Sequence, residues 1–110
     1  MAYDEDLAGQ VRSVIRNQDG VTEKAMFGGL AFLINGNMAV SASGQGGLLV
    51  RVNPGETDSV VREDGVTRVE MRGRAMDGWV RVASSATAST QELTRWVRVG
   101  VAYAASLPPK

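Results

Sequence analysis

Few side chains in this sequence could carry covalent or metal chemistry. None of the 110 residues is histidine or cysteine, which excludes imidazole acid–base catalysis, thiolate nucleophiles and the common zinc ligands. Asp4, Glu5 and Asp6 are consecutive, so on a helix they point in different directions and cannot act as a pair. Glu63 and Asp64 are adjacent at an expected turn, where water reaches them. We therefore expect no catalytic residue, no metal and no cofactor, and a protein that is not an enzyme.

Arginines gather around one tryptophan in the second half of the sequence. These candidate interaction residues are Arg68, Arg72, Arg74, Trp79 and Arg81. If Val80 and Val82 face the core, alternation along residues 78 to 82 turns Trp79 and Arg81 outward. Arg68 and Arg72 of the preceding strand would then lie beside them. An aromatic ring among cations can stack on single-stranded bases or on a side chain of a partner protein. The alternatives are a solvated sheet face and a tryptophan covered by a helix or by a dimer mate.

Two glycine-rich segments invite a binding-loop interpretation. Residues 44 to 47 (GQGG) precede an expected strand, whereas a phosphate-binding loop needs a helix N-terminus after its glycines, so we predict a hairpin loop. Residues 26 to 29 (MFGG) are expected to bend the backbone while Met26 and Phe27 pack. The alternative for this second segment is that its glycines leave backbone amides accessible to a partner.

The composition is that of one domain spanning residues 1 to 110. Apolar residues make up 44% and charged residues 22%, as in soluble globular proteins, and the apolar runs are too short to span a bilayer. The acidic N-terminus lacks the features of a secretory signal, so we expect a cytoplasmic protein without membrane contact. Twelve basic residues balance twelve acidic ones, which removes the overall positive field typical of proteins that bind nucleic acid through phosphates.

The hydrophobic pattern predicts two long helices around a sheet. Apolar residues at helical spacing mark residues 4 to 17, with Asp4 as the N-cap, and residues 90 to 106, capped by Ser89 or Thr90. Short apolar runs between turn residues predict strands at 22 to 27, 30 to 34, 38 to 42, 48 to 52, 66 to 72 and 78 to 82, with a short helix within 54 to 63. The predicted class is α+β: an antiparallel sheet of five to six strands with N- and C-terminal helices packed on it, in the order α-β-β-β-β-α-β-β-α.

The turn at residues 35 to 37 decides the register of the second and third strands. A two-residue turn at Asn35 and Gly36 pairs Ile34 with Asn37 and leaves apolar residues on both faces. A three-residue turn with Asn37 in the left-handed conformation pairs Ile34 with Met38 instead. Since that register gathers the apolar residues on one face, we predict the three-residue turn.

The last helix has a broad apolar arc. Its width exceeds what one sheet contact requires, and the edge around Trp96, Val99 and Tyr103 is a candidate homodimer contact. The alternative is a helix that fills a groove between the sheet and the first helix.

The chain also resembles a known family. The block EKAMFGGLAFLINGNMAV at residues 23 to 40, followed by LLVRV at 48 to 52, is similar to the TfoX (Sxy) N-terminal domain family. The start MAYDEDLAGQVRSVI, the later MRGRAMDGWVRV and the end SLPPK extend the resemblance over the whole chain. It implies a compact α+β domain of a bacterial, cytosolic protein, related by name to regulators of DNA-uptake competence. Full-length competence regulators also have a helical C-terminal domain, which we do not expect in this protein, and the family offers no catalytic residues to map.

The expected function follows from these observations. We expect a stand-alone TfoX N-terminal-like domain that acts in regulation or as an adaptor through contacts with an unidentified protein, and that forms a homodimer. The alternative is a nucleic-acid-associated regulator of transcription or competence that uses the face with Trp79 and its arginines.

Overall fold

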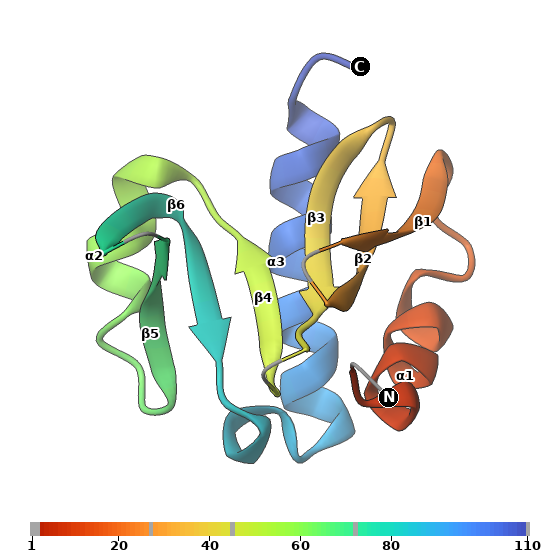
Figure 1. Cartoon of the computed structure of the whole chain (residues 1–110). Coiled ribbons are helices and arrows are strands. Elements are labelled where there is room, and N and C mark those ends of the chain that lie inside the picture. The colour runs from red at the N-terminus through yellow and green to blue at the C-terminus, as the bar shows by residue number, and fades with distance from the viewer. Residues whose placement is uncertain (1–2, 27, 45, 72, 110) are drawn as a thin grey trace.

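The computed structural model describes residues 3–26, 28–44, 46–71 and 73–109, and only the backbone of Met71 and Ala75. Within these residues, six strands form one antiparallel sheet in the order β1-β2-β3-β4-β6-β5 (Figure 1). The strands are β1 (Val21–Met26), β2 (Gly29–Ile34), β3 (Asn37–Ala42), β4 (Leu48–Arg51), β5 (Val66–Met71) and β6 (Arg74–Val82). The helices are α1 (Glu5–Ile15), α2 (Thr57–Val60) and α3 (Thr90–Ser106), with 3-10 turns η1 (Pro54–Glu56) and η2 (Ser84–Thr87). The predicted α+β class and element order are confirmed.

Both long helices begin at the predicted caps. The Asp4 carboxylate accepts hydrogen bonds from the backbone N–H groups of Asp6 and Leu7, and the Ser89 hydroxyl accepts one from Glu92. These contacts satisfy donors that the first turn of a helix leaves unpaired. The predicted helix at 54 to 63 is shorter and begins as η1, and β6 begins at Arg74 rather than at residue 78.

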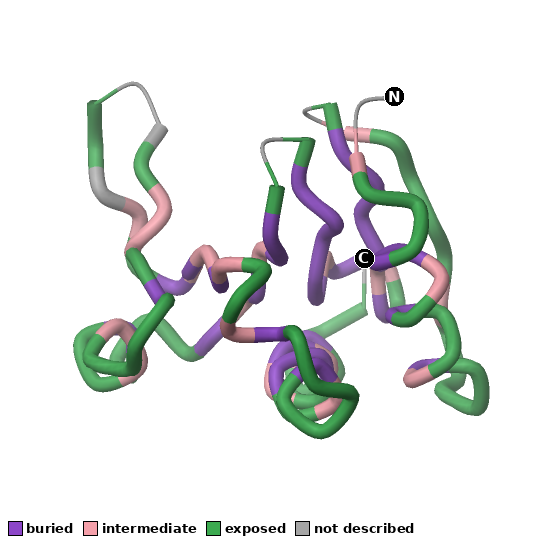
Figure 2. The backbone as a smooth tube through the Cα atoms, turned by 90° about the horizontal axis from the view of Figure 1, so that it is seen from below, coloured by how far each residue is buried: buried purple, intermediate pink, exposed green. Residues whose placement is uncertain are grey.

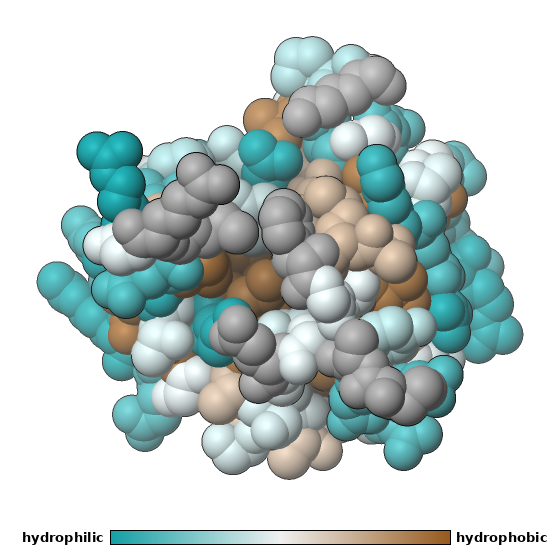
Figure 3. Space-filling model, viewed as in Figure 1, coloured by the Kyte–Doolittle hydropathy of each residue, from teal (hydrophilic) through white to brown (hydrophobic). Residues whose placement is uncertain are grey.

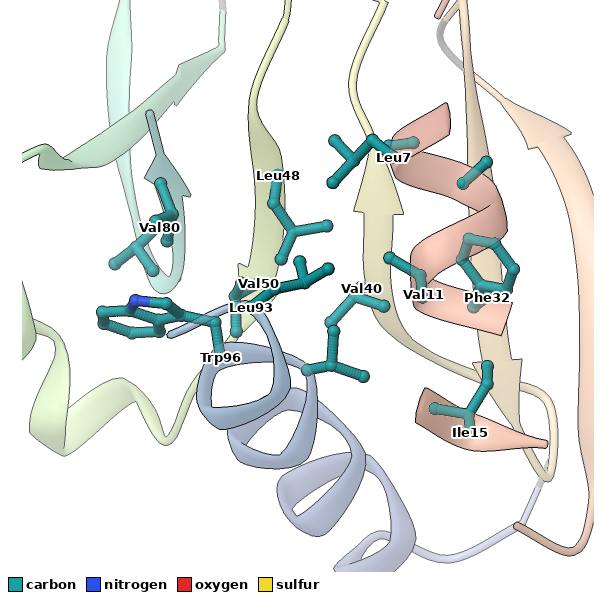
Figure 4. Packing of buried hydrophobic residues seen from close by; sticks show 14 of the residues in the cluster. Leu7, Val11, Ile15, Phe32, Val40, Leu48, Val50, Val80, Leu93 and Trp96 are labelled. Atoms are coloured by element: carbon teal, nitrogen blue, oxygen red, sulfur yellow. The ribbon is translucent and has the colours of Figure 1, made fainter. Parts of the chain in front are cut away.

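One face of the sheet carries the core. Side chains from α1, α3 and the strands meet in one buried cluster, in which Val11, Phe32, Val40, Val50 and Val80 have no exposed surface. Figure 4 shows Leu7 and Val11 of α1 pointing toward Val40 of the sheet, with Phe32 beside the same helix. An antiparallel sheet commonly packs one face on the core and leaves the other face in contact with solvent. The face turned away from α1 and α3 is therefore not part of this core.

The longest helix of the described part, α3, lies close against the sheet. In Figure 1 the strands β3 and β4 pass in front of it, and Figure 2 shows it to one side of all the strands. A Cβ atom added at Gly100 would lie 2.5 Å from the Ala39 carbonyl oxygen and 2.7 Å from Val40 Cγ1, so only glycine permits this approach. No helix in the described ranges has both the length and the apolar character needed to cross a bilayer.

The predicted turn between β2 and β3 is wrong. Ile34 pairs with Asn37, not Met38, and the turn consists of Asn35 at φ 53° and Gly36 at φ 85°, both in the left-handed region. A register shift between Phe32 and Leu33 then sets Phe32 opposite Val40 instead of Ala39. This bulge keeps the apolar residues on one face without the three-residue turn. It also leaves Met38 outside the core row.

Candidate interaction surface

A row of paired residues crosses all six strands on the sheet face turned away from α1 and α3, which we call the outer face. The strand pairing joins, in order, Lys24, Ala31, Ser41, Leu49, Arg81 and Thr67. The adjacent row contains Phe32, Val40, Val50 and Val80, all in the core. Since successive residues of a strand point to opposite faces, the first row defines the outer face.

Apolar side chains gather on the outer face although no described helix covers it. They are Leu33, Met38, Leu49, Val69, Met76 and Trp79, all half-buried. The half-buried side chains that pack against the core cluster are different ones, such as Val14 of α1 and Val99 of α3. Figure 3 looks onto the outer face and shows brown hydrophobic atoms recessed near its centre. Soluble proteins seldom expose an apolar area of this kind without a partner.

Arg51 links the outer face to α3. Its guanidinium carbon lies 5.5 Å from the centroid of the Trp79 ring and 5.8 Å from that of the Tyr103 ring. Arg51 and Trp79 are cross-strand partners on β4 and β6, whereas Tyr103 belongs to α3. A guanidinium near aromatic rings is attracted to their faces, and its N–H groups can still donate to a carboxylate.

Arg81 is fixed in place on the same face. Its Nη1 donates to the Ser43 hydroxyl at 2.8 Å and to the Gly46 carbonyl at 3.1 Å. Both acceptors follow β3, at the hairpin that leads into β4. A cation that is already ordered loses less conformational entropy when a partner binds.

The structure does not bring the predicted arginine and tryptophan residues together. Trp79 and Arg81 lie on the outer face as predicted, but Arg68 does not. It pairs with the core residue Val80 and forms ion pairs with Asp58 of α2 and with Asp77. Val66 is buried and pairs with Val82, so alternation along β5 turns Arg68 to the helix side as well, which explains the error. Arg74 is exposed at the start of β6, and Arg72 lies outside the described residues.

The predicted dimer residues also separate. Trp96 is 2% exposed and belongs to the core, with the guanidinium of Arg95 over its ring at 4.5 Å. Val99 and Tyr103 are half-buried and line a shallow groove with Val52, Asn53, Glu56, Ala102 and Ser106. A partner could therefore reach Val99 and Tyr103 but not Trp96. In the segment at residues 26 to 29, Gly29 is paired in β2, and Phe27 lies outside the described residues.

The described ion pairs lie on the helix side of the sheet or on the helices. Arg12 of α1 holds Glu23 of β1 through two hydrogen bonds, of 2.7 and 2.8 Å. Chiefly through these bonds, Arg12 lowers the pKa of the Glu23 carboxyl below its ordinary value. Arg95 pairs with Glu63 and Glu92. Among the described residues, no group of three or more acids is placed to hold a metal ion.

Sequence reasoning missed Arg51, Leu33 and Met38 as parts of the outer face. The pattern LLVRV carried the signal for Arg51, because burial of Val50 and Val52 turns the residue between them to the other face. Its contact with Tyr103 depends on how α3 crosses the sheet, which no local pattern shows. The place of Met38 follows from the bulge in the hairpin.

Comparison with known proteins identifies the family. The model of the TfoX N-terminal domain matches residues 14–104. This chain belongs to the TfoX N-terminal domain family. The match begins in α1, includes every described strand and extends into the last turn of α3, so the outer face lies within the TfoX domain. No curated protein and no solved structure is significantly similar to the chain.

Proposed function

We propose that this TfoX N-terminal domain is a non-enzymatic cytoplasmic regulatory or adaptor domain that binds a partner protein through its outer face. The observation that carries the proposal is the set of half-buried apolar side chains around Arg51 and Trp79, which lie apart from the core cluster. Tryptophan, methionine and arginine are the residue types enriched where proteins contact one another. Regulation through protein contacts also agrees with the competence regulators for which the family is named.

Site-specific photo-crosslinking in the native cytosol tests this proposal. A photoreactive amino acid replaces Leu49 on the outer face, and the matched control replaces Gln10, which is exposed on α1. We expect a discrete protein adduct from position 49 and none from position 10. Adducts that are equal at both positions, or absent from position 49, would contradict a partner on the outer face.

A homodimer through the groove at Val99 and Tyr103 is a separate part of the proposal. The groove lies along α3 and includes apolar and polar residues, as self-association surfaces do. Light scattering of the wild type and of a Val99→Glu variant measures it. We expect a dimer that dissociates in the variant, and a monomeric wild type would contradict it.

A nucleic-acid-associated regulator is the second candidate function. The observation that favours it is Trp79 beside Arg51 and near Arg81, because bases stack on aromatic rings within a basic surface. Binding of single-stranded DNA or RNA that weakens steeply with salt would support this function. Absence of binding at low salt would rule it out.

A further inference from the structure

The charges on the two faces of the sheet are separated. Glu23 is bound by Arg12 and Asp77 by Arg68, both on the helix side, and alternation along β5 places Glu70 on the side of Arg68. The acids of the described strands thus lie on the helix side, whereas the outer face carries the cations Lys24, Arg51 and Arg81. Because the whole chain has a formal net charge of zero, this imbalance results from where the residues lie and not from composition.

We propose that the outer face binds an acidic peptide segment with apolar side chains, whose carboxylates pair with Arg51 and Arg81 while its apolar groups cover Leu49 and Met38. This inference rests on the proposed function and specifies the chemistry of the partner. Opposite charges on two surfaces guide association and fix the register of the complex. Burial of apolar side chains supplies most of the affinity.

The geometry of the two arginines suits carboxylates. The Arg51 guanidinium lies within cation–π distance of the Trp79 and Tyr103 rings, and a guanidinium can bind a carboxylate through two parallel N–H···O bonds. The Leu49–Arg81 pair lies two residues along the same two strands from the Arg51–Trp79 pair. Hydrogen bonds to Ser43 and Gly46 hold the Arg81 guanidinium toward the hairpin before β4. Leu49 therefore lies between the two cationic groups. An extended or helical segment with acids on either side of an apolar residue matches this order.

A second copy of the chain does not fit the outer face. Two-fold pairing sets this surface against itself and brings no acid of the described strands to Arg51 and Arg81. Juxtaposed like charges cost free energy at an interface. The occupant is therefore a different molecule or a segment of opposite charge.

A peptide fits this face better than nucleic acid does. The surface consists mainly of aliphatic and thioether side chains, Leu33, Leu49, Met38 and Met76, with Trp79 as the one aromatic ring among its described residues. Non-specific nucleic-acid sites instead combine several stacking rings with a continuous cationic track. Arg68, which would have extended such a track, is engaged by Asp58 and Asp77 on the other side.

Selection from a random peptide library displayed on phage tests the inference. The immobilised wild-type chain selects peptides, and the Leu49→Asp variant removes those that bind elsewhere. We expect the enriched peptides to combine Asp or Glu with Leu, Phe or Trp, and their affinity to fall with salt. The methyl NMR signals of Met38 and Met76 should shift when such a peptide is added.

Matched arginine variants distinguish the role of charge from that of folding. Arg51→Gln should weaken binding of a selected peptide about tenfold. The control Arg98→Gln, at an exposed position on α3, should leave binding unchanged, and both variants should unfold near the wild-type midpoint. Equal effects of the two variants would overturn the inference.

The remaining outcomes separate this inference from the proposed function. If neutral or basic peptides shift the methyl NMR signals of Met38 and Met76, the inference that the partner is acidic is wrong. The proposal that the outer face binds a protein would still stand. A selection that yields no peptide specific for this face would overturn both. Displacement of the peptide by single-stranded DNA at physiological salt would favour the nucleic-acid alternative.

Discussion

The two faces of this sheet are formed by neighbouring residues of the same strands. They differ in how far their apolar side chains are buried and in which groups their arginines contact. On the helix side, Leu48, Val50 and Val80 are fully buried under α1 and α3. On the outer face, Leu49, Arg51 and Trp79 alternate with them and remain half-buried. Arg68 on the helix side has two carboxylate partners, whereas the guanidinium of Arg51 lies over aromatic rings.

This difference indicates which residues maintain the fold and which are available to a partner. A buried apolar group contributes to stability in the isolated chain, but a half-buried group on an uncovered face completes its burial only in a complex. Substitutions on the helix side should therefore lower stability. Substitutions on the outer face should spare stability and affect binding.

The two tryptophans give the largest expected contrast. Trp96→Ala removes a core side chain and should lower the free energy of unfolding by about 3–5 kcal/mol. Trp79→Ala removes a half-buried ring and its contact with Arg51, and should cost about 1 kcal/mol. Urea unfolding followed by circular dichroism measures both. Similar losses in the two variants would show that the outer face is part of the structural core.

Leu48 and Leu49 test the same contrast within one strand. Leu48→Ala leaves a cavity in the core and should cost about 2–5 kcal/mol. Leu49→Ala should cost less than about 1 kcal/mol, because the outer face can adjust around a smaller side chain. Thermal unfolding midpoints rank the two variants, and a reversed ranking would mean that the two faces have been assigned the wrong way round.

Gly100 tests how closely α3 approaches the sheet. Gly100→Ala forces the new methyl group against Ala39 and should destabilise the chain by about 1–3 kcal/mol. The control Gly9→Ala in α1 places its methyl group where no atom lies within 4 Å, and should stabilise by roughly 0.5–1 kcal/mol. Chemical unfolding checks both signs. A neutral Gly100→Ala would indicate a looser contact between α3 and β3.

Glu23 gives the smallest effect, and it depends on pH. The pKa of its carboxyl is lower in the folded chain than in the unfolded chain, so the pair with Arg12 stabilises at pH values above the ordinary pKa of 4.5. This contribution disappears as the pH falls through the lower folded pKa. Glu23→Gln should therefore reduce stability slightly at neutral pH and not at all in acid. Unfolding curves at several pH values test this, and a larger loss in acid would have the wrong sign.

The sequence predicted the parts of the fold that depend on local pattern. The caps at Asp4 and Ser89 and the order of helices and strands follow from hydrogen-bonding preferences and hydrophobic spacing. The face of Arg68 was wrong because it depends on which residues of β5 pair with the core residues Val80 and Val82 of β6. The partner of Ile34 was wrong because the register of its hairpin depends on a bulge. One extra residue in a strand reverses the alternation beyond it, and its position depends on packing across the sheet.

The candidate surface was only partly predictable for the same reason. Trp79 and Arg81 could be assigned outward from the alternation of β6 alone. The burial of Trp96 and the contact of Arg51 with Tyr103 depend on the angle at which α3 crosses the strands. That angle is set by packing at Gly100 and its neighbours, which the sequence pattern does not specify.

An NMR titration tests the central claim most directly. A selected acidic peptide is added to the isotope-labelled chain, alongside a counterpart in which Gln and Asn replace Glu and Asp. Shifts at Leu33, Met38, Leu49 and the Trp79 indole that are stronger with the acidic peptide are the predicted result. Shifts confined to α1 and α3, or equal shifts with both peptides, would contradict it.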